Sequence, residues 1–224
     1  SVFVVFREPA SDHIVAAGSL TAKDVRRVGG KLQLFGSAGT YELISSKGRT
    51  QKVRIPAPAP PLEIAGGWDV QFLDGMGAPK NTHFAKLESW TDRPERDIKY
   101  YSGSATYTKV INVSKKSLDA GNPVLDLGEV RDLVDVNVNG KHVGTLWKPP
   151  YRISLKGVLK LGENELEITV ANTWLNRFVG DLKLHGRWGV KKENGPRYTE
   201  EGQGTDDYSE NTPILESGLL GPVR

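Results

Sequence analysis

Two short segments joined by Asn139-Gly140 constrain the fold of this chain more than any other feature. Polar and apolar residues alternate through Leu133–Val138, and a second strand-like run, Lys141–Leu146, follows directly after the two-residue connection. Asn and Gly tolerate the positive φ angles that a type I′ turn requires. The sequence therefore predicts a tight antiparallel hairpin here, and this is the strongest hairpin signal in the chain.

Other periodic segments also show the two-residue alternation of β-strands. In Gly67–Phe72 this alternation places Trp68, Val70 and Phe72 on one face. Further strands are expected at Ser104–Val113, Pro123–Leu127, Tyr151–Leu155 and Glu165–Val170. Many short strands at regular spacing predict a sandwich or a barrel.

Helical periodicity is hard to find. The one weak helix candidate is Ala17–Val28, where Thr21 and Asp24 have capping-box spacing, and a strand fits this segment about as well. A long polar stretch, 191–211, interrupts the strand pattern before a terminal apolar run. A loop of this length in a compact domain is usually functional or mobile.

A proline-rich run divides the chain. Alternating prolines cannot join a sheet ladder and favour an extended conformation, so residues 56–61 are predicted to be a stiff linker. It separates a small β subdomain, residues 1–55, from a larger domain, residues 62–224. Because the chain opens without Met in strand-like sequence (Val2–Phe6), we expect a fragment or processed product, with 1–55 as the end of a preceding domain. Lys31–Phe35 and Gly39–Ser45 are the other strands expected in 1–55.

Composition excludes several classes of protein. The 224 residues are 38% hydrophobic and 25% charged, which is ordinary for a globular protein. The net charge of +3 is dispersed among both signs, so nucleic acid is not an expected partner. The absence of cysteine excludes disulfides and thiolate metal sites. No apolar run reaches the roughly 20 residues of a membrane helix, and no membrane partner is expected.

Several motifs resemble a known family. Trp90-Thr91-Asp92 followed by Ile98–Tyr107 is similar to the W-T-D … I-K-Y-Y-S-G-T-A-T-Y run of large bacterial glycoside hydrolases. The hairpin 138–144 with Leu146–Arg152, then 162–168, 172–177 and 216–224, continue the similarity in the same order. Together they resemble the C-terminal region of α-L-rhamnosidase-type enzymes (glycoside hydrolase family 106 and relatives) and the sugar-binding jelly roll of family 2 glycosidases.

The resemblance implies a fold and a function. The fold class would be all-β, a galactose-binding-like jelly-roll β-sandwich preceded by the small β subdomain. The function would be that of a non-catalytic accessory domain that binds plant or bacterial polysaccharide, secreted or periplasmic, with the catalytic domain of its parent chain as partner. Catalytic carboxylates would then lie on a separate barrel, so we assign no catalytic residue and do not expect an enzyme. The alternative is a structural domain that supports the barrel without binding glycan.

Sugar recognition needs flat aromatic rings and fixed polar groups. Trp147 ends a hairpin strand and precedes Lys148-Pro149-Pro150, which cannot continue strand pairing, so it is expected at a rim. A sugar contact and a structural anchor are both open for it. Trp68, Tyr107 and Trp174 fit strand patterns or strand ends and are expected in the core instead. Trp188, beside the long polar stretch, and Tyr101 are the other aromatic candidates.

A polar cluster after the last predicted strand adds three candidates. Asn176, Arg177 and Asp181 are expected in a loop, where they could bond vicinal sugar hydroxyls. The favoured alternative is that Arg177 and Asp181 form an ion pair that anchors the loop. The carbohydrate-binding candidates are therefore Trp147, Asn176, Arg177, Asp181, Trp188 and Tyr101.

Metal binding has weak support. The acidic residues of the long polar stretch could offer oxygen ligands to Ca²⁺, but no calcium-loop pattern is present and a solvated acidic loop is favoured. These residues are Glu200, Glu201, Asp206, Asp207 and Glu210. The four histidines lack metal-ligand spacing. No cofactor is predicted, and Ca²⁺ stays an open alternative.

Overall fold

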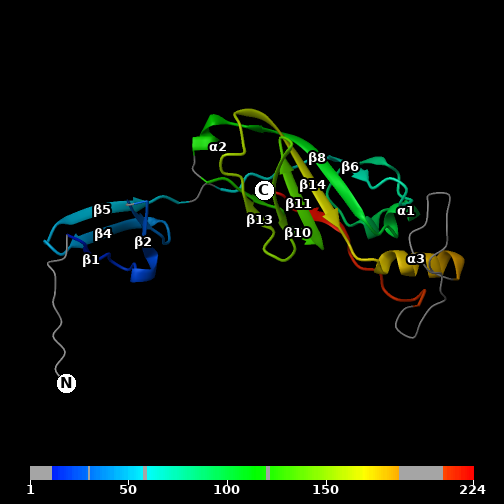
Figure 1. The fold of residues 1–224 in the computed structure, drawn as a ribbon, viewed down its shortest axis with the longest axis horizontal. Coiled ribbons are helices and arrows are strands. Elements are labelled where there is room, and N and C mark those ends of the chain that lie inside the picture. The colour runs from blue at the N-terminus through cyan, green and yellow to red at the C-terminus, as the bar shows by residue number, and fades with distance from the viewer. Residues whose placement is uncertain (1–11, 30, 58–59, 120–121, 187–208) are drawn as a thin grey trace, which may run out of the picture. The chain divides into compact units, whose positions relative to one another are not determined.

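The computed structural model divides the chain into two compact units, residues 1–60 and 61–224 (Figure 1). It describes residues 12–29, 31–57, 60–119, 122–186 and 209–224. Strands dominate both units and few residues are helical, which confirms the all-β sandwich class. The predicted strand Val2–Phe6 lies outside the described residues.

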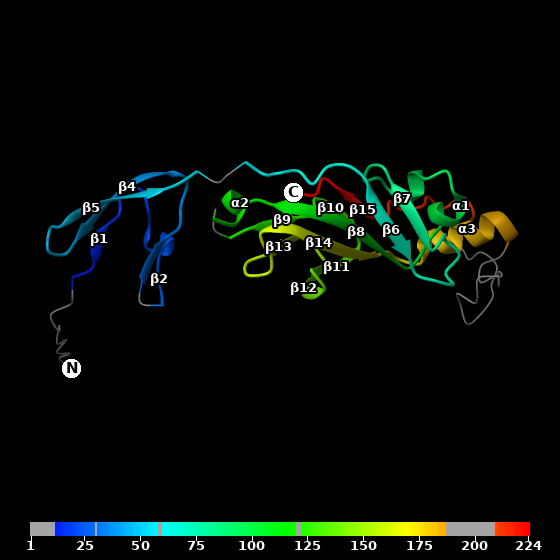
Figure 2. The ribbon, with the colours of Figure 1, turned by 90° about the horizontal axis from the view of Figure 1, so that it is seen from above.

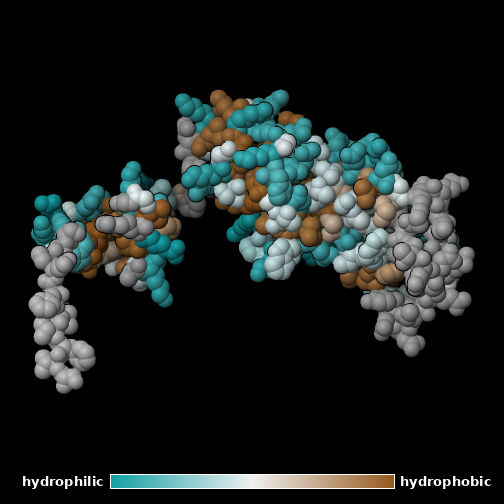
Figure 3. All heavy atoms as spheres, viewed as in Figure 1, coloured by the Kyte–Doolittle hydropathy of each residue, from teal (hydrophilic) through white to brown (hydrophobic). Residues whose placement is uncertain are grey.

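The first unit is small and has few buried apolar side chains. A three-stranded antiparallel sheet has the order β1-β4-β5, and β2 and β3 form a separate hairpin. Among the described residues of this unit, Ala17 and Leu43 are the buried apolar ones, and Figure 3 shows apolar side chains on its surface. Its elements are β1 (Ile14–Ala16), the 3-10 turn η1 (Ala22–Asp24), β2 (Val25–Val28), β3 (Lys31–Leu34), β4 (Gly39–Ser45) and β5 (Thr50–Ile55).

The weak helix candidate of the first unit becomes a short turn and a strand. The Asp24 carboxylate accepts a hydrogen bond from the Thr21 N–H at 2.8 Å, so the capping box forms as its spacing predicts. It caps only the single turn of η1, because β2 begins at the next residue.

The second unit contains a six-stranded antiparallel sheet with the strand order β12-β11-β14-β8-β6-β7. All but one of its strands were predicted, with end points close to those observed; the short edge strand β7 was missed. The strands are β6 (Trp68–Phe72), β7 (Asn81–Phe84), β8 (Ser104–Val113), β11 (Leu133–Val138), β12 (Lys141–Leu146) and β14 (Gly162–Ala171).

Two short strand pairs, β9 with β13 and β10 with β15, accompany the large sheet (Figure 2). The core lies on the inner side of the large sheet, where Trp68, Val70 and Phe72 are all at most 2% exposed, as the alternation predicts. Leu219 of β15 is fully buried in the same core. The remaining elements are β9 (Val124–Asp126), β10 (Glu129–Arg131), β13 (Arg152–Ser154), β15 (Gly218–Gly221), η2 (Trp90–Asp92), α1 (Arg96–Lys99), α2 (Lys115–Asp119) and α3 (Leu175–His185).

The Asn139-Gly140 hairpin forms as predicted. Asn139 has φ 53° and Gly140 has φ 73°, and both positive values are those of a type I′ turn. The Asn139 side chain donates to Asn164 Oδ1 at 2.9 Å and accepts from the Glu165 N–H at 3.1 Å. The turn is therefore also bonded to β14, the neighbour of β11 on its other side.

Two expectations about the region after β14 are wrong. Residues 175–185 form the helix α3, where a loop was expected. The sequence did not reveal this helix because its buried side includes the polar residues Asn176, Arg177 and Asp181 and so lacks the apolar stripe by which helices are recognised. Trp174 was expected in the core, but it sits at the N-terminus of α3 and is 43% exposed.

Candidate functional site

Tyr101 lies in the core of the second unit. Its side chain is 1% exposed, its hydroxyl donates to the Ser104 carbonyl at 2.8 Å, and the same oxygen accepts from the Leu73 N–H at 3.3 Å. The ring packs edge-on against Phe72 and Trp90. Both the ring and the hydroxyl therefore hold structure together and are closed to a glycan in this conformation.

Asn176 is also fully engaged within the chain. Its amide nitrogen donates to the Leu215 carbonyl at 2.7 Å and to Ser217 Oγ at 2.9 Å, and its Oδ1 accepts from the Leu215 N–H at 2.7 Å. With the side chain only 2% exposed, no donor of this amide is left for a sugar hydroxyl. Asn176 joins α3 to the segment that leads into β15.

Arg177 and Asp181 form the ion pair that was favoured over sugar binding. Arg177 Nε lies 2.8 Å from Asp181 Oδ1, one turn along α3, and the two side chains are 6% and 1% exposed. The N–H direction is poorly aligned with this oxygen, so the contact is an ion pair more than a directed hydrogen bond. The Arg177 N–H also donates to Ser102 Oγ at 3.2 Å. The pair joins successive turns of α3, and the backbone hydrogen bond to Ser102 attaches the helix to the segment before β8.

Trp147 differs from these candidates because it is 69% exposed. It follows the last residue of β12, and the Lys148 Nζ lies 5.1 Å from the centre of its ring. An indole with this exposure can stack on the apolar C–H face of a sugar ring. Trp188 lies outside the described residues.

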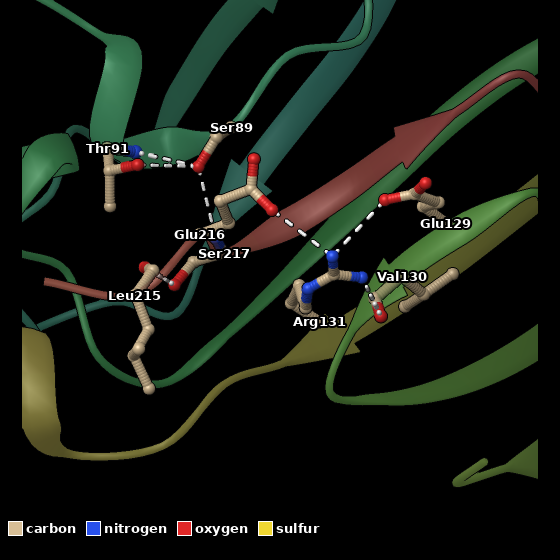
Figure 4. Close-up of polar contacts among 8 residues, drawn as sticks. All are labelled: Ser89, Thr91, Glu129, Val130, Arg131, Leu215, Glu216 and Ser217. Carbon is tan, nitrogen blue, oxygen red and sulfur yellow. Dashed lines mark hydrogen bonds and ion pairs between the residues drawn. The ribbon is translucent and has the colours of Figure 1, made fainter. Parts of the chain in front are cut away.

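A further polar cluster flanks the β10–β15 pair (Figure 4). Ser89 Oγ accepts from the Ser217 N–H at 3.0 Å, and Arg131 Nη2 lies between carboxylate oxygens of Glu129 and Glu216 at 3.2 and 3.1 Å. The bonds from Ser217 to Ser89 and from Arg131 to Glu216 link segments that are far apart in sequence, whereas Glu129 and Arg131 lie on the same strand. The Arg131 pairs are solvent-exposed and contribute little stability. The Ser217–Ser89 hydrogen bond is the buried contact of this cluster, and it joins the segment before β15 to the residue that caps η2.

The strongest candidate site is the outer side of the six-stranded sheet. Strand register places two rows of side chains across all six strands, directly opposite one another from strand to strand. All twelve residues are polar and exposed or half-buried. We call the first row the glutamine ladder: Asn81, Gln71, Thr106, Thr169, Asp135 and Thr145. We call the second the histidine ladder: His83, Asp69, Thr108, Glu167, Asn137 and His142.

Hydrogen bonds hold parts of these ladders in place. Thr106 and Thr169 share a hydroxyl–hydroxyl bond of 2.8 Å. Asp135 accepts from Thr145 Oγ1 at 2.6 Å and lies 2.7 Å from His142 Nε2. Partial burial acts to raise the pKa of Asp135, but the bonds from Thr145 and His142 outweigh it and hold that pKa below its ordinary value. Asp135 is thus a fixed, ionised acceptor near the β12 edge.

An open groove of about 470 Å³ lies at the other end of the ladders. It runs over β6, β7 and β8, and His83 Nδ1 lies 2.8 Å from Asp69 Oδ1 at its rim. Its lining residues are Asp69, Val70, Gln71, Asn81, Thr82, His83 and Thr108. Its volume is within the range of small-molecule sites.

The alternation of β12, continued by one residue, is expected to place Trp147 on the same side of the sheet as the outer sheet face. Thr145 is opposite Asp135, and Leu146 is opposite the buried Val134. Continuing this alternation places Trp147 outward, opposite Leu133, which is itself 42% exposed. An aromatic ring thus follows the end of the edge strand β12, a polar groove lies over the strands at the other edge, and hydroxyl, amide and carboxylate groups lie between them.

Sequence reasoning missed the outer sheet face. A polar outer side is ordinary for an antiparallel sheet, so polarity alone did not single it out. The available signal was the kind of polar residue, since neither ladder contains Lys or Arg. Which residues stand opposite one another depended on a register that the sequence does not show.

Metal and membrane sites find no support in the part of the chain that the structure describes. No group of three or more His, Asp or Glu side chains there is arranged to hold a metal ion. Of the acidic residues considered for Ca²⁺, only Glu210 lies within the described residues. None of the described helices is long and apolar enough to cross a membrane.

Comparison with known proteins decides the family. The family model described as "Glycosyl hydrolase 2 galactose-binding domain-like" matches residues 87–200, which span most of the six-stranded sheet. The chain belongs to this family. The predicted resemblance to family 2 and rhamnosidase-type glycoside hydrolases is thereby confirmed. The part that matches is a galactose-binding-like domain.

Two relatives show how this galactose-binding-like chain relates to longer proteins. A Formosa agariphila protein named "Putative beta-glucuronidase" is 38% identical over 202 residues, covering 83% of this chain and 17% of that protein. The rhamnosidase of Novosphingobium sp. PP1Y superposes with a TM-score of 0.62 at 30% identity, over 87% of this chain and 19% of that one. The chain thus spans less than a fifth of the length of either relative.

Proposed function

We propose that this galactose-binding-like chain is a non-catalytic accessory domain of a glycoside hydrolase and binds carbohydrate through its outer sheet face and Trp147. The observation that carries the proposal is the exposed indole beside two ladders of polar side chains on one side of a single sheet. Stacking on the indole would supply affinity, and the fixed hydroxyls, amides and carboxylates would bond sugar hydroxyls. Membership in a family named for galactose binding supports the same function.

The catalytic function belongs, in this proposal, to another part of a longer protein. The matched segment covers 17% and 19% of the two named relatives, so each is more than five times as long as that segment. The residues of the outer sheet face stand on rigid strands, which suits a surface that holds a polysaccharide near a separate active site. Asp69 and Asp135 would act as hydrogen-bond acceptors there and not as a hydrolytic pair.

The test is binding of the 224-residue chain to soluble plant and bacterial polysaccharides, by affinity gel electrophoresis and calorimetry. Trp147→Ala is expected to weaken binding of the best ligand roughly tenfold, a loss of about 1.4 kcal/mol. Trp147→Phe keeps a flat ring and is expected to retain most of the affinity. Phe35→Ala, which removes an exposed ring from the first unit, is the matched control and should leave affinity unchanged.

Two results would overturn the proposal. A folded chain that binds none of the polysaccharides would leave the structural alternative, a domain that supports a catalytic barrel. The same alternative follows if Trp147→Ala lowers thermal stability but leaves affinity for a bound polysaccharide unchanged.

A further inference from the structure

The two ladders extend much further than a single sugar ring. They cross five interstrand gaps from β12 to β7, and neighbouring strands lie about 4.8 Å apart, so the rows are about 24 Å long. Polar groups occur at every step of both rows. A ligand that used the whole face would therefore be a chain that lies across the strands.

The exposed indole of Trp147 and the polar groove lie at opposite ends of the two ladders. Trp147 follows β12, the strand at one edge of the sheet, whereas the groove of about 470 Å³ lies over β6 and β7 at the other edge. Gln71 and Asn81 stand opposite each other in that groove and end the glutamine ladder. One small sugar cannot contact both ends.

The charge of the face limits the chemistry of that chain. Asp69, Asp135 and Glu167 are carboxylates in the ladders, and Glu163 and Glu165 add two more on the outward side of β14. The two ladder histidines each lie within 2.8 Å of a carboxylate oxygen, and the one ammonium group that the described contacts place at an end of the face is that of Lys148, 5.1 Å from the Trp147 ring. A glycan with a carboxylate or sulfate on each unit would meet repulsion along the rows.

We propose that the outer sheet face binds an extended, uncharged glycan chain laid across the six strands, with one end at Trp147 and the other in the groove. This inference rests on the proposed function and specifies its ligand. Hydroxyl groups of a neutral chain find acceptors in the carboxylates and both donors and acceptors in the threonine hydroxyls and the amides. A uronate-rich chain and a single terminal sugar are the ligand classes that it excludes.

The test measures binding by calorimetry to neutral cello-, manno-, xylo- and galacto-oligosaccharides of one to six units. Oligogalacturonates of the same lengths are the charged probes. We expect affinity for the best neutral series to rise at least tenfold from two to six units, and the uronate hexamer to bind at least tenfold more weakly than the neutral hexamer.

Variants at the two ends test the geometry. Trp147→Ala and the double variant Gln71→Ala/Asn81→Ala should each weaken hexamer binding at least fivefold, and their effects should combine additively because the sites are far apart. Gln33→Ala, an exposed glutamine of the first unit, is the matched control and should have no effect. Circular dichroism and melting temperature establish that each variant is folded.

The outcomes separate this inference from the proposed function. If no carbohydrate binds, the proposed function fails and this inference fails with it. If neutral sugars bind but affinity rises less than tenfold from two to six units, or the uronate hexamer binds less than tenfold more weakly than the neutral one, only this inference is overturned. The same holds if Gln71→Ala/Asn81→Ala leaves hexamer affinity unchanged while Trp147→Ala lowers it.

Discussion

The buried hydroxyl of Tyr107 connects strand β8 to the 3-10 turn η2 and to strand β15. The side chain extends inward from β8, is fully buried, and its oxygen accepts hydrogen bonds from Trp90 Nε1 and from the Leu219 N–H. Burial raises the pKa of Tyr107 well above its ordinary value, since it disfavours the phenolate. The neutral hydroxyl is thus the acceptor for donors from η2 and β15.

Tyr107→Phe should therefore destabilise the second unit. The substitution leaves two buried donors without a partner, and each such group costs about 1–3 kcal/mol, so we expect a loss of about 2 kcal/mol or more in the free energy of unfolding. Urea unfolding followed by tryptophan fluorescence measures it. Tyr151→Phe is the control within the same unit, because the Tyr151 hydroxyl donates to the Asp132 carbonyl at 2.8 Å and its loss leaves no N–H donor unpaired, so we expect a loss of no more than about 1 kcal/mol. Equal effects of the two changes would contradict this account.

Asp135 should make stability depend on pH. Its folded-state pKa lies below the ordinary value of 3.8, because hydrogen bonds from Thr145 and His142 outweigh the effect of burial. A depressed pKa contributes stability that is fully present above the unfolded-state pKa and is lost as the pH falls through the folded-state pKa. The stability difference between the unchanged chain and Asp135→Asn should therefore be largest above about pH 4 and shrink below it.

Urea unfolding at a series of pH values between 2.5 and 6 checks this, with the midpoint of each curve as the readout. Asp69→Asn is the matched control, because Asp69 also pairs with a histidine but is 84% exposed. We expect it to change stability by less than about 0.5 kcal/mol throughout. A difference for Asp135→Asn that is independent of pH would exclude the proposed role of its carboxylate.

At the scale of elements, predictability depended on whether the buried side of an element is apolar. Alternation located nearly all the strands of the large sheet, and Asn139-Gly140 located its hairpin, because those signals lie within a few neighbouring residues. The helix α3 was missed because Asn176, Arg177 and Asp181 face inward, and their partners lie elsewhere in the chain or on the helix itself. The ladders of the outer sheet face were missed because each pair in them depends on long-range register.

Gly180 shows how α3 packs. A Cβ at this position would lie 2.6 Å from Cβ and Cγ of Tyr100, close to the backbone of its neighbour. Helix propensity alone predicts that Gly180→Ala stabilises α3 by about 1 kcal/mol. Overpacking typically costs about 1–3 kcal/mol, so the contact with Tyr100 predicts that Gly180→Ala destabilises the second unit.

We therefore expect Gly180→Ala to lower the melting temperature measured by circular dichroism. Lys183→Ala, on the exposed side of the same helix, is the matched control and should have little effect. A higher melting temperature for Gly180→Ala would contradict the close packing of α3 against Tyr100.

At the scale of the whole molecule, the core and its closure belong to residues 61–224. All members of the main hydrophobic core lie between Ile64 and Val223. The last residues of the chain complete this core, because β15 pairs with β10. The Ile64 N–H donates to the Val223 carbonyl at 2.8 Å, and Asp126 and Arg224 exchange two backbone hydrogen bonds. Sequence alternation could place strands in this unit, but not the pairing of its first and last segments.

A chain of residues 61–224 should consequently fold alone, with one cooperative urea transition and the near-ultraviolet circular dichroism of fixed aromatic packing. A chain of residues 61–213 should lose both signals, because it lacks Leu219 and Val223, which are at most 1% exposed, and leaves β10 without its partner. A synthetic peptide of residues 214–224 added to the shorter chain should restore part of the aromatic signal. Cooperative unfolding of 61–213 without the peptide would mean that β15 is dispensable and that the large sheet holds its core by itself.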